Sequence, residues 1–306
     1  MVITMTIAEK SEKKIKKNRG SKREKFSLLD GIILFFLLIG SAVIVLPFVS
    51  VIATSFATHQ EFLDARLLLW PQNPTVDNYF RLFQDLRIPI GFRTTLTFLF
   101  IGVPLNMFLT TSLSYGLSRT NFPGGKFFFY AVLITMLFNG GIVPLFLLHM
   151  QLGIINTIWA VIMSWGVNTF YFIIMRTYFT TIPDSLIESA KLDGAGEWKI
   201  LFSIILPLAK PIIACILLFY SVDRWNEWWF SMIFIRDPSI IPLQLVLRHI
   251  VIDAVLAHTV PMDDLPVFTG GIRMATVVVT IVPVMLFFPF LQKYFVKGIM
   301  IGAVKA

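Results

Sequence analysis

The sequence contains little charge and almost no cysteine. Asp, Glu, Lys and Arg make up only 14% of its 306 residues, whereas a soluble domain carries about 25%. Apolar residues make up 56%, which excludes a soluble globular enzyme, a disordered chain and a fibrous protein. The single cysteine, Cys215, excludes a disulfide scaffold and a cysteine-rich metal site. These shortages leave an integral membrane protein.

Sequence patterns typical of enzymes are also missing. There is no G-x-x-x-x-G-K-[ST] phosphate loop, no G-x-S-x-G and no H-E-x-x-H. The four histidines are scattered without the spacing of metal ligands. We therefore expect no catalytic residues, no metal site and no cofactor in this chain.

Six continuous apolar stretches are each long enough to cross a hydrocarbon core of about 30 Å as a helix. They cover residues 31–57, 94–118, 127–150, 154–175, 208–235 and 274–292. Barrel strands would alternate in polarity, and these stretches do not. A helix also satisfies its own backbone hydrogen bonds in lipid. The sequence predicts an all-α polytopic membrane protein with six transmembrane helices.

The basic residues predict the orientation of these helices. Six spans place both termini on one side, which receives 18 of the 26 lysines and arginines. Positive charge accumulates on the cytoplasmic side, so we expect both termini there, in the cell (inner) membrane. The net charge of +8 then reflects topology and attraction to anionic lipid, and it does not indicate a nucleic-acid partner.

The chain is predicted to have two parts. Residues 1–30 form a basic cytoplasmic tail, disordered at its start, and residues 31–306 form the membrane domain. The first apolar run is longer than the core of a cleaved signal, so we expect it to be retained. On the outer side, residues 59–93 are expected to contain a short helix after two prolines. A second external helix is expected over residues 244–255, where apolar residues recur at helical spacing.

One cytoplasmic loop, residues 181–210, is amphipathic rather than a plain connector. Ser185 and Glu188 fit a capping box at the start of a helix. Leu186, Ile187 and Ala190 share one face of that helix, and Gly194 falls where the helix must stop. A second amphipathic stretch, residues 197–206, ends at Pro207. About thirty ordered residues at this place predict a docking surface.

Charged residues inside a membrane are the default candidates for function. One cluster qualifies, and it lies in the fifth predicted span: Asp223, Arg224, Trp225, Asn226, Glu227 and Trp228. Arg224 and Glu227 are spaced i, i+3 and can pair. Asp223 and Glu227 share a face, so we expect both to contact Arg224 or a neighbouring helix. The cluster fits a polar, aromatic lining for a sugar path, and it equally fits an outer aromatic belt with a self-compensated ion pair.

Asn139, Gly140 and Gly141 interrupt the third predicted span. A broken helix at membrane depth is tolerated only inside protein or beside a water-filled cavity. The interruption is thus a candidate for a pathway element or hinge. Close helix packing through small residues explains it as well.

The cytoplasmic loop carries a resemblance to a known family. Residues 188–195 read E-S-A-K-L-D-G-A, and residues 204–207 read I-I-L-P. This resembles the EAA loop of ABC-importer permeases, E-A-A-x-x-D-G-A followed by I-x-L-P, with Ser189 in place of the middle alanine. The C-terminal tail from Gln292 to Ala306 looks like that of the maltose-permease G subunit. The F-N-G-G stretch at residues 138–141 looks like the polysaccharide and complex-oligosaccharide branch of that carbohydrate family.

The resemblance covers the six spans but not the basic tail, and it implies a type I ABC importer permease fold. It implies a second, different permease chain and two ATPase subunits that bind ATP and magnesium. An extracellular or periplasmic sugar-binding protein would deliver the substrate. The loop would be the helix that couples to the ATPase, through Leu186, Ile187, Glu188, Ser189, Ala190, Asp193, Gly194 and Ala195. In it Glu188 would cap the helix or pair with the ATPase, Gly194 would permit the turn, and Asp193 would cap the second segment.

Other functions stay open at this point. The chain also fits the permease of an ABC importer for a substrate other than sugar. Only a measurement of substrate binding distinguishes such a permease from a sugar permease. A polytopic membrane enzyme would need the Asp223 and Glu227 carboxylates as its acid and base. A stand-alone secondary transporter would need an inverted repeat or a chain of buried carboxylates, and the sequence displays neither.

Overall fold

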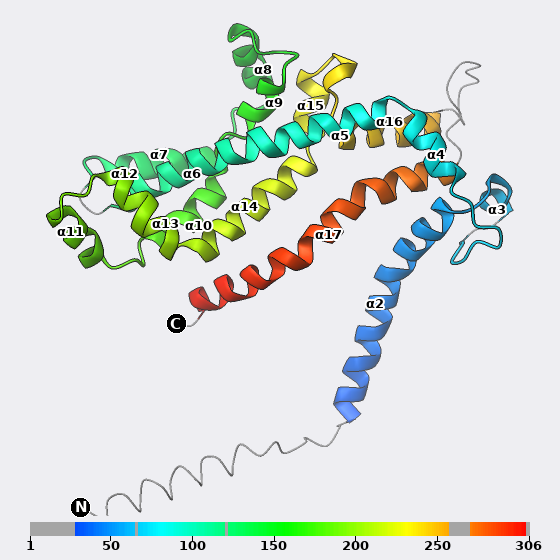
Figure 1. The fold of residues 1–306 in the computed structure, drawn as a ribbon, viewed down its shortest axis with the longest axis horizontal. Coiled ribbons are helices and arrows are strands. Elements are labelled where there is room, and N and C mark those ends of the chain that lie inside the picture. The colour runs from blue at the N-terminus through cyan, green and yellow to red at the C-terminus, as the bar shows by residue number, and fades with distance from the viewer. Residues whose placement is uncertain (1–27, 65–66, 120–121, 257–269, 304–306) are drawn as a thin grey trace, which may run out of the picture. The chain divides into compact units, whose positions relative to one another are not determined.

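The computed structural model describes residues 28–64, 67–119, 122–256 and 270–303 (Figure 1). The chain divides into two compact units, residues 1–49 and 50–306, which are described separately. Every regular element in the described residues is helical, as the sequence predicted. The predicted basic tail lies almost wholly outside the described residues.

The first unit is described from residue 28 and consists of most of α2 (Leu28–Ser55). A helix of 28 residues is about 42 Å long at 1.5 Å per residue, which exceeds the hydrocarbon core of a bilayer. Its mean hydropathy reaches 3.0 over 18 residues. The first predicted span is therefore confirmed as one helix long and apolar enough to cross a membrane.

The second unit begins with the last turn of α2 and continues through a series of helices (Figure 1). Its first half contains α3 (His59–Asp64), α4 (Asp77–Gln84), α5 (Arg87–Thr97), η1 (Phe98–Gly102), α6 (Val103–Ser118), α7 (Gly125–Leu137), α8 (Ile142–Gln151), α9 (Ile158–Ser164) and α10 (Thr169–Phe179). Its second half contains α11 (Asp184–Leu192), α12 (Glu197–Ile200), η2 (Leu201–Ile205), α13 (Leu206–Leu208), α14 (Lys210–Trp225), α15 (Trp229–Phe234), η3 (Pro238–Ile240), α16 (Leu243–Leu256) and α17 (Gly270–Ala303).

The second predicted span is one helical run, α5–η1–α6, from Arg87 to Ser118. It begins before residue 94, the start that hydropathy predicted. The Asp85 carboxylate accepts the backbone N–H of Arg87 at 2.9 Å, and Pro89 lies in the first turn, where its missing N–H costs nothing. The start was predicted too late because Arg87 and Arg93 lower the hydropathy of the first two turns of this helix.

Two predicted spans are bent, and a third bend lies at the start of the fifth predicted span, where loop 181–210 meets it. α7 meets α8 at 116°, α9 meets α10 at 52°, and the α12–α13 segment meets α14 at 89°. The first bend falls at residues 138–141, where the sequence predicted an interruption. The second was not predicted. It forms because the Asn168 side chain accepts the backbone N–H groups of Phe170 and Tyr171, and so starts a new helix.

The exact number of spans stays a prediction. Within the described residues, two helices are long and apolar enough to cross a membrane, or five spans if each bent pair is counted as one. The predicted sixth span, residues 274–292, lies inside α17, a helix of 34 residues. The predicted fifth span is wrong at its end, because the helix stops at Trp225 and α15 follows as a separate element.

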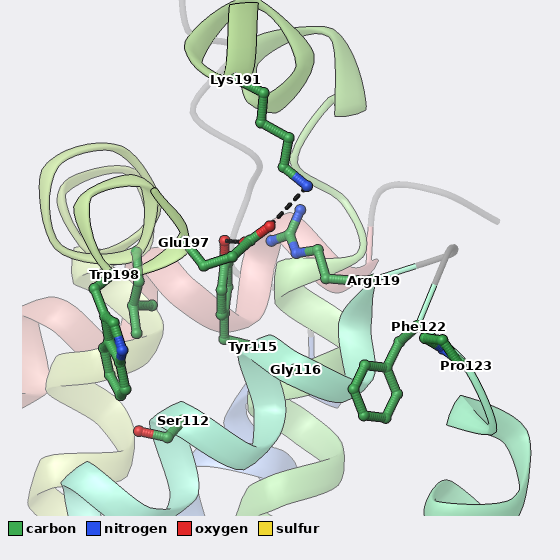
Figure 2. Close-up of a pocket in the computed structure, with 10 residues that line it drawn as sticks. Ser112, Tyr115, Gly116, Arg119, Phe122, Pro123, Lys191, Glu197 and Trp198 are labelled. Atoms are coloured by element: carbon green, nitrogen blue, oxygen red, sulfur yellow. Dashed lines mark hydrogen bonds and ion pairs between the residues drawn. The ribbon is translucent and has the colours of Figure 1, made fainter. Parts of the chain in front are cut away.

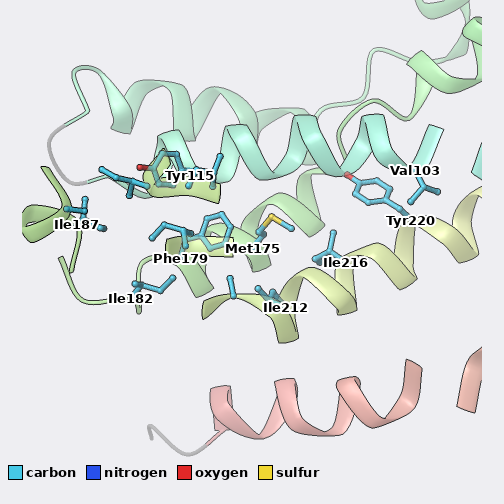
Figure 3. Close-up of a cluster of buried hydrophobic side chains, with 14 residues drawn as sticks. Val103, Tyr115, Met175, Phe179, Ile182, Ile187, Ile212, Ile216 and Tyr220 are labelled. Carbon is cyan, nitrogen blue, oxygen red and sulfur yellow. The ribbon is translucent and has the colours of Figure 1, made fainter. Parts of the chain in front are cut away.

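The two predicted external helices are present as α4 and α16. α16 is not a lone helix, since Leu243, Val246 and Ile250 are buried against Ile88 of α5 and Ile272 of α17. A second apolar cluster holds loop 181–210 against the long helices (Figure 3). It includes Val103, Tyr115, Met175, Phe179, Ile182, Ile187, Ile212, Ile216 and Tyr220.

Candidate functional site

The loop that was predicted to dock a partner contains α11, and its start differs from the prediction. The extended residue before the helix is Pro183, with φ −58° and ψ 130°, so the helix begins at Asp184. The Pro183 carbonyl accepts the backbone N–H of Leu186 at 3.2 Å, and no side chain caps the helix. The predicted capping box of Ser185 and Glu188 is therefore wrong, because Ser185 already has helical backbone and cannot act as N-cap.

The C-terminal end of α11 lies where the sequence predicted it, next to Gly194. Gly194 has φ +78°, a conformation that favours glycine. Its N–H donates to the Lys191 carbonyl at 3.0 Å, and the N–H of Ala195 donates to the Ala190 carbonyl at 2.9 Å. This is the Schellman pattern, which satisfies the last carbonyls of a helix. α11 therefore ends in a defined turn rather than a frayed one.

The apolar face of α11 points into the chain itself. Ile187 and Ala190 are buried in the cluster of Figure 3, so the expectation that they contact a partner is wrong. Leu186 is 44% exposed and Leu192 is 90% exposed. An exposed leucine at each end of the helix, with Glu188 exposed between them, leaves the outer face of α11 free to meet another protein.

Two polar contacts connect α11 to α12 and α6 (Figure 2). The Lys191 Nζ lies 2.7 Å from Glu197 Oε1, and the Tyr115 hydroxyl donates to Glu197 Oε2 at 2.5 Å. Glu197 lies in loop 181–210, outside the predicted spans. The hydrogen bond from Lys191, followed by that from Tyr115, lowers the pKa of Glu197 below its usual 4.5. We call Tyr115, Lys191 and Glu197 the latch.

The predicted capping of the second segment by Asp193 is wrong. α12 begins at Glu197 with Gly196 as its N-cap, and no side chain caps it. Sequence reasoning also missed Tyr115, which lies inside a predicted span far from the loop in sequence. Local spacing gives no signal for this contact, because Tyr115 and Glu197 are 82 residues apart.

A cavity of about 460 Å³ lies beside the latch (Figure 2). Its wall combines the end of α6 with the loop residues before α7 and with α12. The Arg119 guanidinium lies over the Tyr115 ring, with its Cζ atom 4.4 Å from the ring centroid. The cavity thus presents cationic and aromatic side chains next to α11.

Arg224, in the predicted embedded cluster, is a buried hydrogen-bond hub. Its Nε and Nη2 atoms each donate to Asn106 Oδ1 at 3.0 Å. Its other donors reach the carbonyls of Val161, Ile162 and Trp165 at 3.2, 2.8 and 3.4 Å. These carbonyls belong to the C-terminal end of α9, which has no helical partners for them. Arg224 therefore connects α14 to α6 and donates hydrogen bonds to the free carbonyls at the C-terminal end of α9.

The carboxylates of Asp223 and Glu227 have partners other than Arg224, and for Asp223 the partner lies on a neighbouring helix, which was one of the two expected arrangements. Glu227 accepts the backbone N–H groups of Phe230 and Ser231 at 2.8 and 3.2 Å, which holds the first turn of α15. Asp223 accepts the Tyr171 hydroxyl of α10 at 2.8 Å. The i, i+3 ion pair is therefore wrong, because backbone and side-chain partners from other segments take its place. Both carboxylates connect separate helices.

The remaining cluster residues divide between core and surface. The Trp225 Nε1 donates to the Thr280 carbonyl of α17 at 3.0 Å, and its ring is buried. Asn226 is exposed, and its Oδ1 accepts from Gln244 at 3.1 Å. The Trp228 ring lies under the Arg248 guanidinium at 4.3 Å. Asn226 and Trp228 are thus the cluster members with accessible polar or aromatic surface.

The interruption at Asn139, Gly140 and Gly141 forms a sharp connection between α7 and α8. Gly141 has φ +86°, and its N–H donates to Asn139 Oδ1 at 2.8 Å. All three residues are exposed, and a Cβ atom at either glycine would meet nothing within 4 Å. Close helix packing therefore does not explain these glycines within the described residues. The backbone turn does.

No group of three or more His, Cys, Asp or Glu side chains that could hold a metal ion is found among the described residues. The Arg224 cluster is built around a guanidinium, an amide oxygen and backbone carbonyls, and it connects separate helices.

Residues 94–301 match the family model described as binding-protein-dependent transport system inner membrane component. The polygalacturonan/rhamnogalacturonan transport system permease protein YtcP of Bacillus subtilis is 38% identical over 287 residues, covering 92% of this chain and 99% of that protein. The arabinooligosaccharides transport system permease protein AraQ of Halalkalibacterium halodurans is 29% identical and covers 85% of this chain and 91% of its own length.

A solved structure is similar over nearly the whole chain. It is the crystal structure of a bacterial ABC transporter involved in the import of the acidic polysaccharide alginate. The TM-score is 0.79 at 28% identity, and the match covers 89% of this chain and 99% of the other.

Proposed function

The chain belongs to the family of binding-protein-dependent transport system inner membrane components, and from that membership we propose that it imports oligosaccharides or polysaccharide fragments. It is a multi-pass permease subunit of an ABC importer and not an enzyme. The names of the relatives support the substrate class, since they include polygalacturonan/rhamnogalacturonan and arabinooligosaccharide permeases and an alginate importer.

The family implies a partner permease, an ATPase and a substrate-binding protein. We propose that the partner permease is a different chain, with which this chain forms the translocation pathway. Two ATPase subunits bind ATP and magnesium, and an extracellular or periplasmic binding protein delivers the sugar. The 18 basic residues on one side of the predicted topology support cytoplasmic termini. They also support our proposal that α11 lies on the ATPase side.

The coupling function is carried by one observation, the way α11 is fixed. Its inner face is buried, the latch connects it to α12 and α6, and its outer face is exposed. An ATPase dimer that closes on ATP moves membrane helices as near-rigid bodies. A helix held in this way transmits a push from Leu186 and Leu192 to α6 without bending. Glu188, Ser189 and Asp193 complete the proposed contact surface, and Gly194 and Ala195 form its turn.

The proposed path uses the exposed polar residues near the helix breaks. Asn139, Gly140 and Gly141 form the connection at one break, and Asn226 and Trp228 form the other. Non-helical backbone at membrane depth is tolerated beside a water-filled cavity. Asp223, Arg224, Trp225 and Glu227 hold these segments in place, since each has partners on other elements or on α15.

Co-purification followed by reconstitution tests this function. The tagged chain should bring down an ATPase and a second six-span chain. In proteoliposomes with the binding protein, a panel of oligogalacturonides, arabinooligosaccharides and alginate oligomers should include at least one that stimulates ATP hydrolysis and enters the vesicles. Stimulation by peptides or amino acids, with no response to any saccharide, would contradict the substrate class.

A further inference from the structure

The cavity beside the latch has a cation without a hydrogen-bond acceptor. The Nε and Nη2 atoms of Arg119 are buried and have no hydrogen-bond partner in the described part of the chain. Neither atom donates to the neighbouring carboxylate of Glu197, which accepts from Lys191 and Tyr115. Figure 2 shows the Arg119 guanidinium beside this pair. Buried N–H groups of a half-buried guanidinium that have no acceptor favour the entry of an anion.

The size and charge of the cavity fit a small anionic group. Its volume of about 460 Å³ lies within the range of sites for small ligands, roughly 300–1,000 Å³. Arg119 and Lys191 contribute two positive charges to its wall, against one negative charge from Glu197. The residual charge is therefore positive.

An exposed aromatic ladder leads away from the cavity. The Trp198 ring lines the cavity and stacks on Phe108 of α6, with centroids 6.2 Å apart and planes at 4°. It also stacks on Phe202 of η2 at 6.1 Å and 21°. All three rings are more than half exposed. A free inorganic anion would leave this apolar surface uncovered, whereas an acyl chain would cover it.

We propose that this cavity binds the phosphate headgroup of an acidic phospholipid, whose acyl chains lie along Phe108, Trp198 and Phe202. Arg119 ends the long helix α5–η1–α6, at the level where a headgroup meets the helix end. The lipid then contacts α6 and α12 together. It adds to the connection that the latch makes between the membrane helices and α11.

Lipid binding to the full-length chain in detergent tests this proposal by native mass spectrometry. The probes are phosphatidylglycerol, phosphatidylcholine of the same acyl chains, and inorganic phosphate. The expected result is preferential binding of phosphatidylglycerol, with its affinity reduced about tenfold in Arg119→Gln. Lys199→Gln is the matched control: it removes a positive charge from α12, the helix that carries Glu197 and Trp198 of the cavity wall, at a residue that does not line the cavity. It should leave the affinity within about twofold.

Three outcomes would overturn the proposal. The first is equal binding of phosphatidylglycerol to the wild type and Arg119→Gln, and the second is equal affinity for phosphatidylcholine. The third is displacement of the lipid by millimolar inorganic phosphate, which would make the cavity a site for a free anion. Arg119→Lys retains the charge and guards against misfolding of the glutamine variant. It should bind phosphatidylglycerol more tightly than Arg119→Gln does, although the ammonium lacks the planar fork of the guanidinium.

Discussion

The Tyr115 hydroxyl on α6 donates a hydrogen bond to the Glu197 carboxylate on α12, and 82 residues separate the two in sequence. Glu197 also holds Lys191 at the end of α11. The three helices are thus connected through one carboxylate. A displacement of α11 reaches α6, a long helix of the membrane domain, through two short polar contacts.

Tyr115→Phe removes this hydrogen bond and keeps the ring under Arg119. We expect the free energy of unfolding to fall by about 1 kcal/mol, the net value of one hydrogen bond. The larger expected effect is on coupling, measured as ATP hydrolysed per sugar imported, which should rise in the variant. Tyr130→Phe on α7 removes a hydroxyl from an exposed tyrosine and serves as the control. An unchanged ratio in Tyr115→Phe would mean that the latch transmits nothing.

Gly194→Val tests the turn after α11. A β-branched residue at φ +78° costs about 1–2 kcal/mol in backbone strain, which displaces the end of the helix. We expect the protein to insert normally but to lose coupled transport in vesicles with its partners. Gly196→Val is the matched control, since Gly196 has φ −72° with open space at its Cβ position. Normal transport by Gly194→Val would refute the role of this turn.

Leu192→Asp tests the outer face of α11. The side chain is 90% exposed, so the free energy of unfolding should change by less than about 0.5 kcal/mol. ATPase co-purification should fall about tenfold, because a charge replaces an apolar contact at the interface. Ile187→Ala is the contrasting variant, expected to cost about 2–5 kcal/mol of stability because Ile187 is buried. The folded fraction of Ile187→Ala should still bind the ATPase, and the reverse pattern in the two variants would contradict the assigned faces.

Arg224→Gln tests the buried hub. The shorter side chain leaves carbonyls of α9 and the Asn106 Oδ1 atom without donors, so we expect a loss of about 1–3 kcal/mol for each buried acceptor left without a partner. Thermal unfolding in detergent measures the change. Arg236→Gln replaces an exposed arginine after α15 and should have little effect. If Arg224→Gln is as stable as wild type but fails to transport, Arg224 contacts the solute, and its hydrogen bonds to the carbonyls of α9 are not its main role.

The latch also predicts a pH dependence. The pKa of Glu197 is lowered in the folded protein, so its ionised form favours the fold. The stability that it contributes is present above its ordinary pKa of 4.5 and is lost as the pH falls through the lowered value. The difference in thermal stability between wild type and Glu197→Gln should be constant from pH 6 to 8 and shrink below pH 4.5. A difference that shrinks already between pH 8 and 6 would show that another group controls the contact.

The sequence predicted the turns and breaks that depend on the backbone conformation of a single residue. Gly194 marked the end of α11 because few other residues adopt its backbone conformation, and the glycines at 140 and 141 marked the bend after α7. The capping box failed although its spacing was correct. Pro183, one residue before the helix, imposed the extended backbone that Ser185 was expected to have.

The hydrogen-bond partners of the cluster side chains lie far away in the sequence, so the spacing of residues along the chain did not reveal them. The spacing of Arg224 and Glu227 allowed an ion pair, but Asn106 and the end of α9 supply acceptors for several donors of the buried guanidinium at once. Glu227 accepts backbone N–H groups of α15 instead. The apolar face of α11 was identified correctly from periodicity. Its partner was not, because Ile187 and Ala190 meet a core built from helices far apart in the sequence.

The measurement that tests the coupling role most directly is photo-crosslinking in the assembled importer. A benzophenone amino acid placed at Leu192 should crosslink to the ATPase, and the same probe at the buried Ile187 should crosslink only within this chain. Crosslinks from Leu192 to lipid alone, or to no protein, in a complex that still hydrolyses ATP would contradict the assignment of α11 as the helix that the ATPase moves.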